Sequence, residues 1–149
     1  MSYISAENLT ARLHKGKLLP ALLLLGEEPY IRDTWRAQIV EKLIPEAARD
    51  WAVCRYSADR GETQNALEQA QTLPMLSSRQ VIFLQDVEKI EKLGEKNREA
   101  AIEQLEAYLE NPAPFTLVVL EATILDQRMK LAKLLIEARL VIHALWIRR

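Results

Sequence analysis

Five short runs of consecutive apolar residues divide this chain, and segments with helical periodicity separate them. Short apolar runs without alternation are typical of strands that are buried on both faces. Such strands form parallel sheets, whose crossover helices cover both faces. The sequence therefore predicts an α/β fold of three layers, with a parallel five-stranded sheet between two layers of helices. The expected strands are 21–25, 52–57, 81–84, 115–120 and 140–147.

The segments between the strands carry helix start and stop signals. Ser5 is a favourable N-cap for a first helix that Gly16 would end. Pro29 follows two acids and is expected to open a second helix, which runs to Pro45. Further helices are predicted over 62–71 and 97–110 and after a capping Asp126, whereas 86–96 is expected to be a loop or a frayed helix.

Composition indicates an ordinary globular domain. The chain has 149 residues, 28% of them charged, and a net charge of −1, so no global field attracts it to nucleic acid or to an anionic membrane. The one cysteine, Cys54, excludes an internal disulfide and a Cys-based zinc site. Its place in an apolar run predicts a buried, unreactive thiol.

The sequence also bears on where the protein works. No segment approaches the roughly 18 consecutive apolar residues of a membrane span. The N-terminus lacks the basic-then-apolar layout of a signal peptide. With a single free thiol, this predicts a cytoplasmic protein without a membrane partner.

The first strand-to-helix junction is the place to look for a phosphate-binding loop. Gly26 holds the first glycine position of such a loop, but Ile31, Arg32 and Asp33 stand where Gly, Lys and Ser/Thr are needed. Glu27 and Glu28 would repel a phosphate, and Glu28 and Asp33 are expected to interact with amides of the helix's own N-terminus instead. The sequence therefore predicts a degenerate phosphate loop without nucleotide.

Other catalytic patterns are weak. Asp86 ends an apolar strand as the metal-orienting Asp of P-loop ATPases does, but Val87 follows it in place of a second acid, so a helix-capping role is favoured. His14 and His143 have no partner placed by the sequence, and structural or solvated roles are favoured for them. No metal or cofactor is expected.

The segment before the third strand is unusual because it is apolar where a polar loop is expected. Leu73, Met75 and Leu76 bracket Pro74, which disfavours helix and places these side chains on a turn. Two interpretations stay open from these residues. The side chains either tuck under the sheet as satellite core residues or form an apolar wedge for a groove on a partner.

A family resemblance rests on three stretches: Pro20 to Tyr30 (PALLLLGEEPY), Gln71 to Asp86 with its phrase Ser77-Ser78-Arg79-Gln80, and Phe115 to Leu120 leading to Leu125–Leu131. In their order and spacing they resemble the N-terminal domain of the delta subunit of the bacterial DNA polymerase III clamp loader. The resemblance covers essentially the whole chain.

This resemblance implies an AAA+-like domain that has lost ATPase function and works within the DNA polymerase III holoenzyme, with no catalysis of its own. It implies that Leu73, Met75 and Leu76 bind a hydrophobic groove on the sliding clamp and promote ring opening for loading onto primed DNA. The other loader subunits are expected as partners and DNA only as an indirect one. The chain departs from the family at Leu76, where an aromatic residue is common.

Length and charge leave further expectations. The chain is expected to be one domain over 1–149, without the lid and collar domains that the family's full subunit carries. Arg128, Lys130 and Lys133 lie near one face of the last predicted helix and could contact DNA phosphates, although solvated surface charge is the favoured interpretation. An ATP-binding AAA+ ATPase domain is the alternative function.

Overall fold

The computed structural model describes residues 1–147, and its centre is a parallel sheet of five strands in the order β2-β3-β4-β1-β5. The predicted fold class is confirmed. The strands are β1 (Ala21–Leu25), β2 (Val53–Ser57), β3 (Gln80–Gln85), β4 (Thr116–Ala122) and β5 (Ile142–Trp146).

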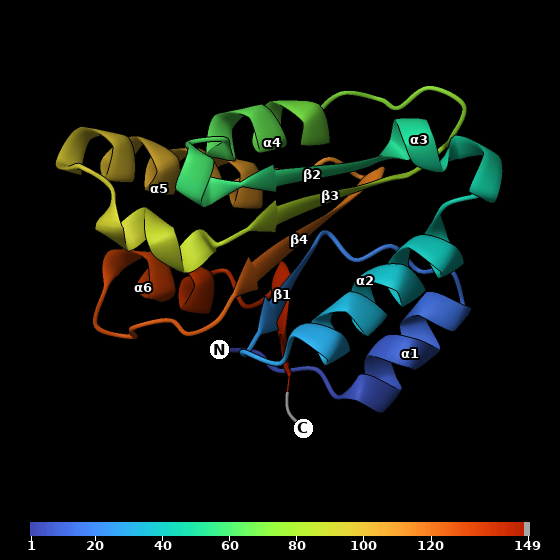
Figure 1. The fold of residues 1–149 in the computed structure, drawn as a ribbon, viewed down its shortest axis with the longest axis horizontal. Coiled ribbons are helices and arrows are strands. Elements are labelled where there is room, and N and C mark those ends of the chain that lie inside the picture. The colour runs from blue at the N-terminus through green and yellow to red at the C-terminus, as the bar shows by residue number, and fades with distance from the viewer. Residues whose placement is uncertain (148–149) are drawn as a thin grey trace.

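Helices cover both faces of this sheet (Figure 1). One face carries α1 (Ala6–His14), α2 (Pro29–Leu43) and the single turn α3 (Arg49–Ala52), and the other carries α4 (Thr63–Ala70), α5 (Glu95–Glu110) and α6 (Lys130–Glu137). Three short 3-10 helices, η1 (Glu46–Ala48), η2 (Ala58–Arg60) and η3 (Val87–Lys92), lie in the connections.

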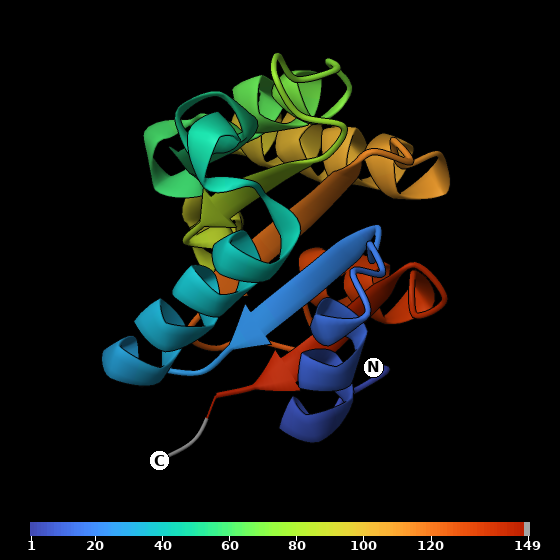
Figure 2. The same cartoon turned by 90° about the vertical axis from the view of Figure 1, so that its right-hand side faces the viewer.

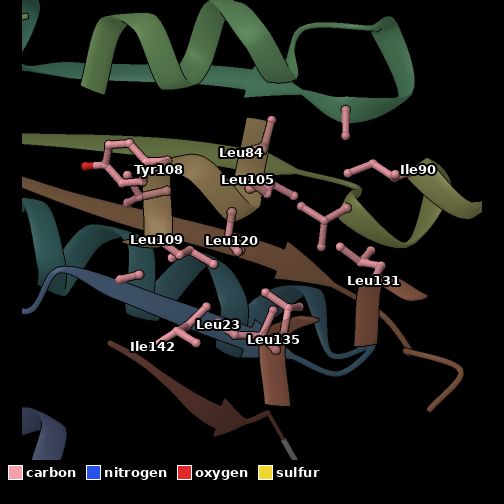
Figure 3. Close-up of a cluster of buried hydrophobic side chains, with 14 of the residues drawn as sticks. Leu23, Leu84, Ile90, Leu105, Tyr108, Leu109, Leu120, Leu131, Leu135 and Ile142 are labelled. Carbon is pink, nitrogen blue, oxygen red and sulfur yellow. The ribbon is translucent and has the colours of Figure 1, made fainter. Parts of the chain in front are cut away.

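Each face buries its own apolar core, because alternate strand residues point to opposite sides. Under α4, α5 and α6, Leu23, Leu84 and Leu120 of the strands face Leu105 and Leu135 of the helices (Figure 3). Under α1 and α2, the strand residues pack against side chains that include Leu9, Leu13, Ile39 and Leu43. Burial on both faces explains why the strands read as continuous apolar runs.

The signals at both ends of the first helix were interpreted correctly. The Ser5 hydroxyl accepts a hydrogen bond from the Asn8 amide at 3.1 Å, and α1 ends just before Gly16, which has a φ of 68°. The prediction that Asp126 caps the last helix is wrong. Helix α6 begins at Lys130, and its Leu131 amide donates to Glu91 Oε1 at 2.8 Å, a contact between segments 40 residues apart.

Several boundaries differ from the predicted ones. Strand β2 begins at Val53 because Ala52 closes the turn α3, and α5 begins at Glu95, directly after Gly94. The charged stretch before α5 contains the 3-10 helix η3. Strand β5 begins at Ile142, two residues later than predicted, because Leu140 lies in the turn that follows α6.

The N-terminal segment covers the β5 edge of the sheet, beside the last strand (Figure 2). The Ile4 amide donates to the Ala144 carbonyl at 2.9 Å, and the Ala144 amide donates to the Ser2 carbonyl at 2.8 Å. These bonds satisfy backbone groups that an open edge would leave unpaired. Over residues 1–147, no helix is long and apolar enough to cross a membrane.

Strands β1 and β4 are neighbours, yet the chain leaves them toward opposite faces, to α2 and to α6 respectively. In open α/β sheets, ligands bind in the crevice that such diverging connections form beyond the carboxyl ends of the strands. The junction after Leu25 is therefore one candidate site. The second candidate site lies at the opposite end of the strands, where they begin. It is the apolar turn between α4 and β3.

Candidate functional site

Three large apolar side chains stand in solvent on the turn between α4 and β3, residues 71–79. Leu73, Met75 and Leu76 are 66%, 67% and 73% exposed, whereas Pro74 between them is buried. The other exposed large hydrophobic side chains of the described chain are distributed over other segments: Tyr3, Tyr30, Trp51, Ile124, Met129, Leu140 and Trp146. We call the exposed trio the apolar wedge. Of the two interpretations of these residues, the satellite-core one is wrong.

The backbone of the turn is shaped at its far end by Leu76 and Ser77. Leu76 has a φ of 61°, in the left-handed region that residues with a Cβ rarely adopt. The Ser77 hydroxyl donates to the Arg79 carbonyl at 2.7 Å and accepts from the Arg79 amide at 3.2 Å. Arg79 Nη1 also donates to the Gly16 carbonyl at 2.7 Å, which ties the turn to the end of α1.

The start of the turn is held by Gln80, whose side chain is fully buried. Its Nε2 lies 2.8 Å from the Gln69 carbonyl oxygen, 3.2 Å from that of Ala70 and 2.7 Å from that of Thr72. It also lies 2.9 Å from Thr116 Oγ1, and this hydroxyl donates to the Ala70 carbonyl at 2.6 Å. Two amide hydrogens thus serve four acceptors from three elements of the fold.

At the carboxyl ends of the strands, groups of the protein itself fill the position of a phosphate loop. Only three residues join β1 to α2, and the first of them, Gly26, has a φ of 142°. A Cβ there would lie 2.4 Å from the Ile147 carbonyl oxygen, so glycine is required. The Gly26 amide donates to the Ala122 carbonyl at 3.0 Å.

Arg32 occupies the crevice between β1 and β4. Its Nη2 donates to the Gly26 carbonyl and, at 3.2 Å, to the Ala122 carbonyl. The carbonyl of the loop therefore turns toward a guanidinium, whereas a phosphate cradle presents amides. Ile31 and Asp33 do not join this arrangement, because Ile31 packs against the apolar core and Asp33 accepts a hydrogen bond from Arg36 at 2.7 Å.

A buried carboxylate lies beside Arg32. Glu121 of β4 is fully buried, and Arg36 donates to both of its oxygens, from Nε at 2.8 Å and from Nη2. Arg32 Nε lies 4.0 Å from Glu121 Oε1. The hydrogen bonds that Arg36 donates to Glu121 raise the pKa of Arg36 above its ordinary value. This acid would face a triphosphate at close range, which Coulomb repulsion opposes.

The predicted capping interactions of acids near strand ends are not formed. Asp86 precedes η3, but its side chain caps no helix and instead accepts from Ser57 Oγ at 3.0 Å. Glu28 is the N-cap of α2 without a side-chain capping bond, and Asp33 pairs with Arg36 instead of the α2 amides. The partner of Asp86 is thus a serine of the neighbouring strand β2, and the partner of Asp33 is an arginine of its own helix.

The three basic residues weighed as DNA contacts do not form one free patch. Arg128 lies before α6, not on it, and pairs with Asp126 at 2.9 Å, which lowers the pKa of Asp126 to about 2. Lys130 pairs with Glu99 of α5 at 2.7 Å, and Lys133 is exposed. Neighbouring carboxylates thus offset two of the three charges. A DNA contact here stays a prediction.

The remaining reactive side chains have ordinary surroundings. Cys54 is half-buried, less than predicted, and burial raises the pKa of its thiol while a hydrogen bond with Tyr56 opposes the rise. Ser2 Oγ lies 3.2 Å from Nδ1 of His143, and His14 is the exposed last residue of α1. No three His, Cys, Asp or Glu side chains among residues 1–147 are placed to hold a metal ion.

Known proteins match nearly the whole chain. The family model described as "DNA polymerase III, delta subunit" matches residues 22–145. The chain belongs to the DNA polymerase III delta subunit family. The predicted family resemblance is therefore confirmed.

Individual relatives agree with this membership. The DNA polymerase III subunit delta of Bacillus subtilis is 28% identical over 128 residues, which are 83% of this chain and 36% of the relative. The structure of the Bacillus subtilis DNA clamp loader delta protein matches with a TM-score of 0.76 and 25% identity, over 92% of this chain and 40% of that one. The chain thus spans well under half the length of the delta proteins that it matches.

A more distant structure shows the fold alone. A DNA polymerase III gamma subunit-related protein from Thermotoga maritima matches with a TM-score of 0.57 and 18% identity, over 96% of this chain and 45% of that one. The α/β architecture of this delta-family chain therefore extends beyond the delta proteins.

Sequence reasoning missed two buried polar residues, Gln80 beside the apolar wedge and Glu121 beside the degenerate phosphate loop. Glu121 stands in the apolar run of β4, and an acid there was a signal, because a fully buried carboxylate needs a partner. Gln80 was noticed only within the phrase that carries the family resemblance. Its role depends on carbonyls of α4 and on Thr116, which the sequence does not bring together.

The filled crevice gives a prediction about nucleotide. Titration of the chain with fluorescent ATP and magnesium is expected to show no saturable micromolar binding by fluorescence anisotropy, because Arg32 and Glu121 occupy the crevice. Micromolar binding that Arg32→Ala abolishes would contradict this and favour the ATPase alternative.

Proposed function

We propose that this delta-family chain is an AAA+-like domain of a clamp loader and that it binds the sliding clamp through the apolar wedge. The observation that carries the proposal is the exposure of Leu73, Met75 and Leu76 on a turn whose two ends are fixed to the fold. A held turn with an exposed apolar tip suits insertion into a hydrophobic groove, because little order is lost on binding. Met75 suits such a contact, since its flexible side chain adapts to the shape of a groove.

The expected affinity rests on these few side chains. Moving a Leu or Met side chain from water into an apolar groove contributes about 1.5–3 kcal/mol each. Three such anchors are enough for a specific contact, because a small number of central residues carries most of the binding energy in protein interfaces.

Ring opening follows from the wedge only through a difference in affinity. A wedge that binds the open clamp more tightly than the closed one shifts the equilibrium by that difference and no further. The domain makes and breaks no bond. ATP acts on other subunits of the loader, and these subunits expose or hide the wedge. The loader works in the cytoplasm. The other loader subunits are its further partners, and DNA is reached through the clamp.

Site-specific photocross-linking tests this proposal. A benzophenone amino acid at position 75, in the wedge, is expected to cross-link to a purified bacterial sliding clamp on illumination, because the side chain there enters the groove. The same amino acid at position 140 serves as the control, since Leu140 is 90% exposed but lies on the turn after α6. Equal cross-linking from both positions, or cross-linking from position 140 alone, would contradict the proposal.

A further inference from the structure

The wedge depends on a turn that is unfavourable by itself. Leu76 holds a left-handed backbone conformation with a φ of 61°, although it carries a Cβ. A conformation of this kind persists only where the surrounding structure fixes it, and such positions cluster at binding sites. The structure must therefore contain groups that hold residues 72–79 in place.

The group that holds the entry to the turn is the Gln80 side chain. It is fully buried at the first position of β3, where an apolar residue would pack as its neighbours Val81 and Ile82 do. Its Nε2 reaches carbonyl oxygens of Gln69 and Ala70 at the end of α4, which a helix end leaves without intrahelical partners. It also reaches the Thr72 carbonyl, inside the turn, at 2.7 Å.

Gln80 is itself fixed from two sides. Its backbone amide donates to the Phe115 carbonyl at 2.9 Å, and Thr116 Oγ1 accepts from its Nε2 at 2.9 Å. A buried amide with its partners in place specifies one arrangement, because leaving its own N–H groups unpaired is unfavourable. Thr72, one residue before Leu73, is held by α4 through its amide, to the Gln69 carbonyl at 3.0 Å, and its hydroxyl, to the Glu68 carbonyl at 3.0 Å. Gln80 adds the contact to the Thr72 carbonyl and so joins the entry of the turn to the start of β4.

We propose that Gln80 is a positioning residue for clamp binding, which holds the α4–β3 turn in the conformation that presents Leu73, Met75 and Leu76. The inference rests on the proposed function of the wedge and adds that the turn is ordered before the partner arrives. Gln80 touches no partner. It acts through Thr72 and the end of α4.

Gln80→Met tests this role, because methionine keeps the length of the side chain and removes its donors. Surface plasmon resonance on immobilised sliding clamp, at a temperature where circular dichroism shows the variant fully folded, is expected to give an affinity about 10-fold weaker than wild type. Hydrogen exchange of the amides at 72–79 is expected to speed up selectively. A merely structural role would lower the melting temperature and leave both the affinity of the folded protein and the exchange of the turn unchanged.

A matched control is Ser57→Ala. It removes two part-buried side-chain hydrogen bonds, to Asp86 at 3.0 Å and from the Asp59 amide at 3.2 Å, at the carboxyl ends of the strands. It is expected to lower stability without changing clamp affinity or exchange in the turn. Should Gln80→Met fail to fold, Thr116→Val offers a milder change, which removes one partner of Nε2 and is expected to weaken clamp binding several-fold.

Failure of this inference can be told apart from failure of the proposed function. Wild-type affinity in folded Gln80→Met, together with loss of binding when the wedge itself is made polar, would overturn the positioning role alone. Undiminished binding by the polar wedge variant would overturn the proposed function, and the positioning role with it.

Discussion

Glu121→Ala is expected to lower the free energy of unfolding by about 3 kcal/mol, because it removes one partner of a buried ion pair. Glu121 is fully buried and accepts two of the hydrogen bonds that Arg36 donates, and the Arg36 side chain is 15% exposed. Without the carboxylate, the Arg36 and Arg32 guanidinium groups face each other across the crevice with no charge between them. The residual exposure of Arg36 keeps the expected loss near the lower end of that for buried pairs.

Urea denaturation at neutral pH, followed by circular dichroism, measures this effect. Asp33→Ala is the matched control: Asp33 pairs with the same arginine at 2.7 Å but is 69% exposed, so its loss is expected to cost at most about 1 kcal/mol. The double variant Glu121→Leu/Arg36→Met is expected to regain most of the lost stability, because apolar residues of similar size replace buried pairs well. Equal effects of Glu121→Ala and Asp33→Ala would contradict a buried pair at this crevice.

The larger expected effect on binding comes from Leu73→Ser/Met75→Ser/Leu76→Ser. Each replacement exchanges a large apolar side chain for a small polar one, so the three together remove roughly 5 kcal/mol of hydrophobic binding energy. That corresponds to a loss of affinity of about 10³-fold or more, which abolishes binding at ordinary concentrations. The fold is expected to survive, because all three side chains stand in solvent and contribute little to either core.

The fold was predictable from the sequence because its main cause is local and repetitive. Runs such as Ala21–Leu25 are apolar throughout, since helices cover both sides of the strand, and caps such as Ser5 act within one helical turn. The predicted start of a helix was wrong where a distant segment supplies the capping side chain. Asp126 looked like a cap, yet Glu91 fills that role from 40 residues away.

The candidate site was predictable only in its exposed part. Leu73, Met75 and Leu76 break the rule that loops are polar, and the degenerate loop at Gly26 breaks the pattern of a phosphate site, so both were visible as exceptions. The sequence did not reveal the side chains that hold the wedge and the degenerate loop in place. Gln80 contacts the end of α4 and Thr116 of the neighbouring strand, and Glu121 contacts arginines of α2, so these groups meet only after the helices have packed on the sheet.

Surface plasmon resonance with immobilised bacterial sliding clamp tests the central claim most directly. The wild-type chain and the control variant Ile124→Ser/Leu140→Ser, which changes two exposed apolar residues away from the wedge, are expected to bind alike. Leu73→Ser/Met75→Ser/Leu76→Ser is expected to give no measurable binding while its circular dichroism spectrum stays native. Wild-type binding by the folded triple variant would contradict the account.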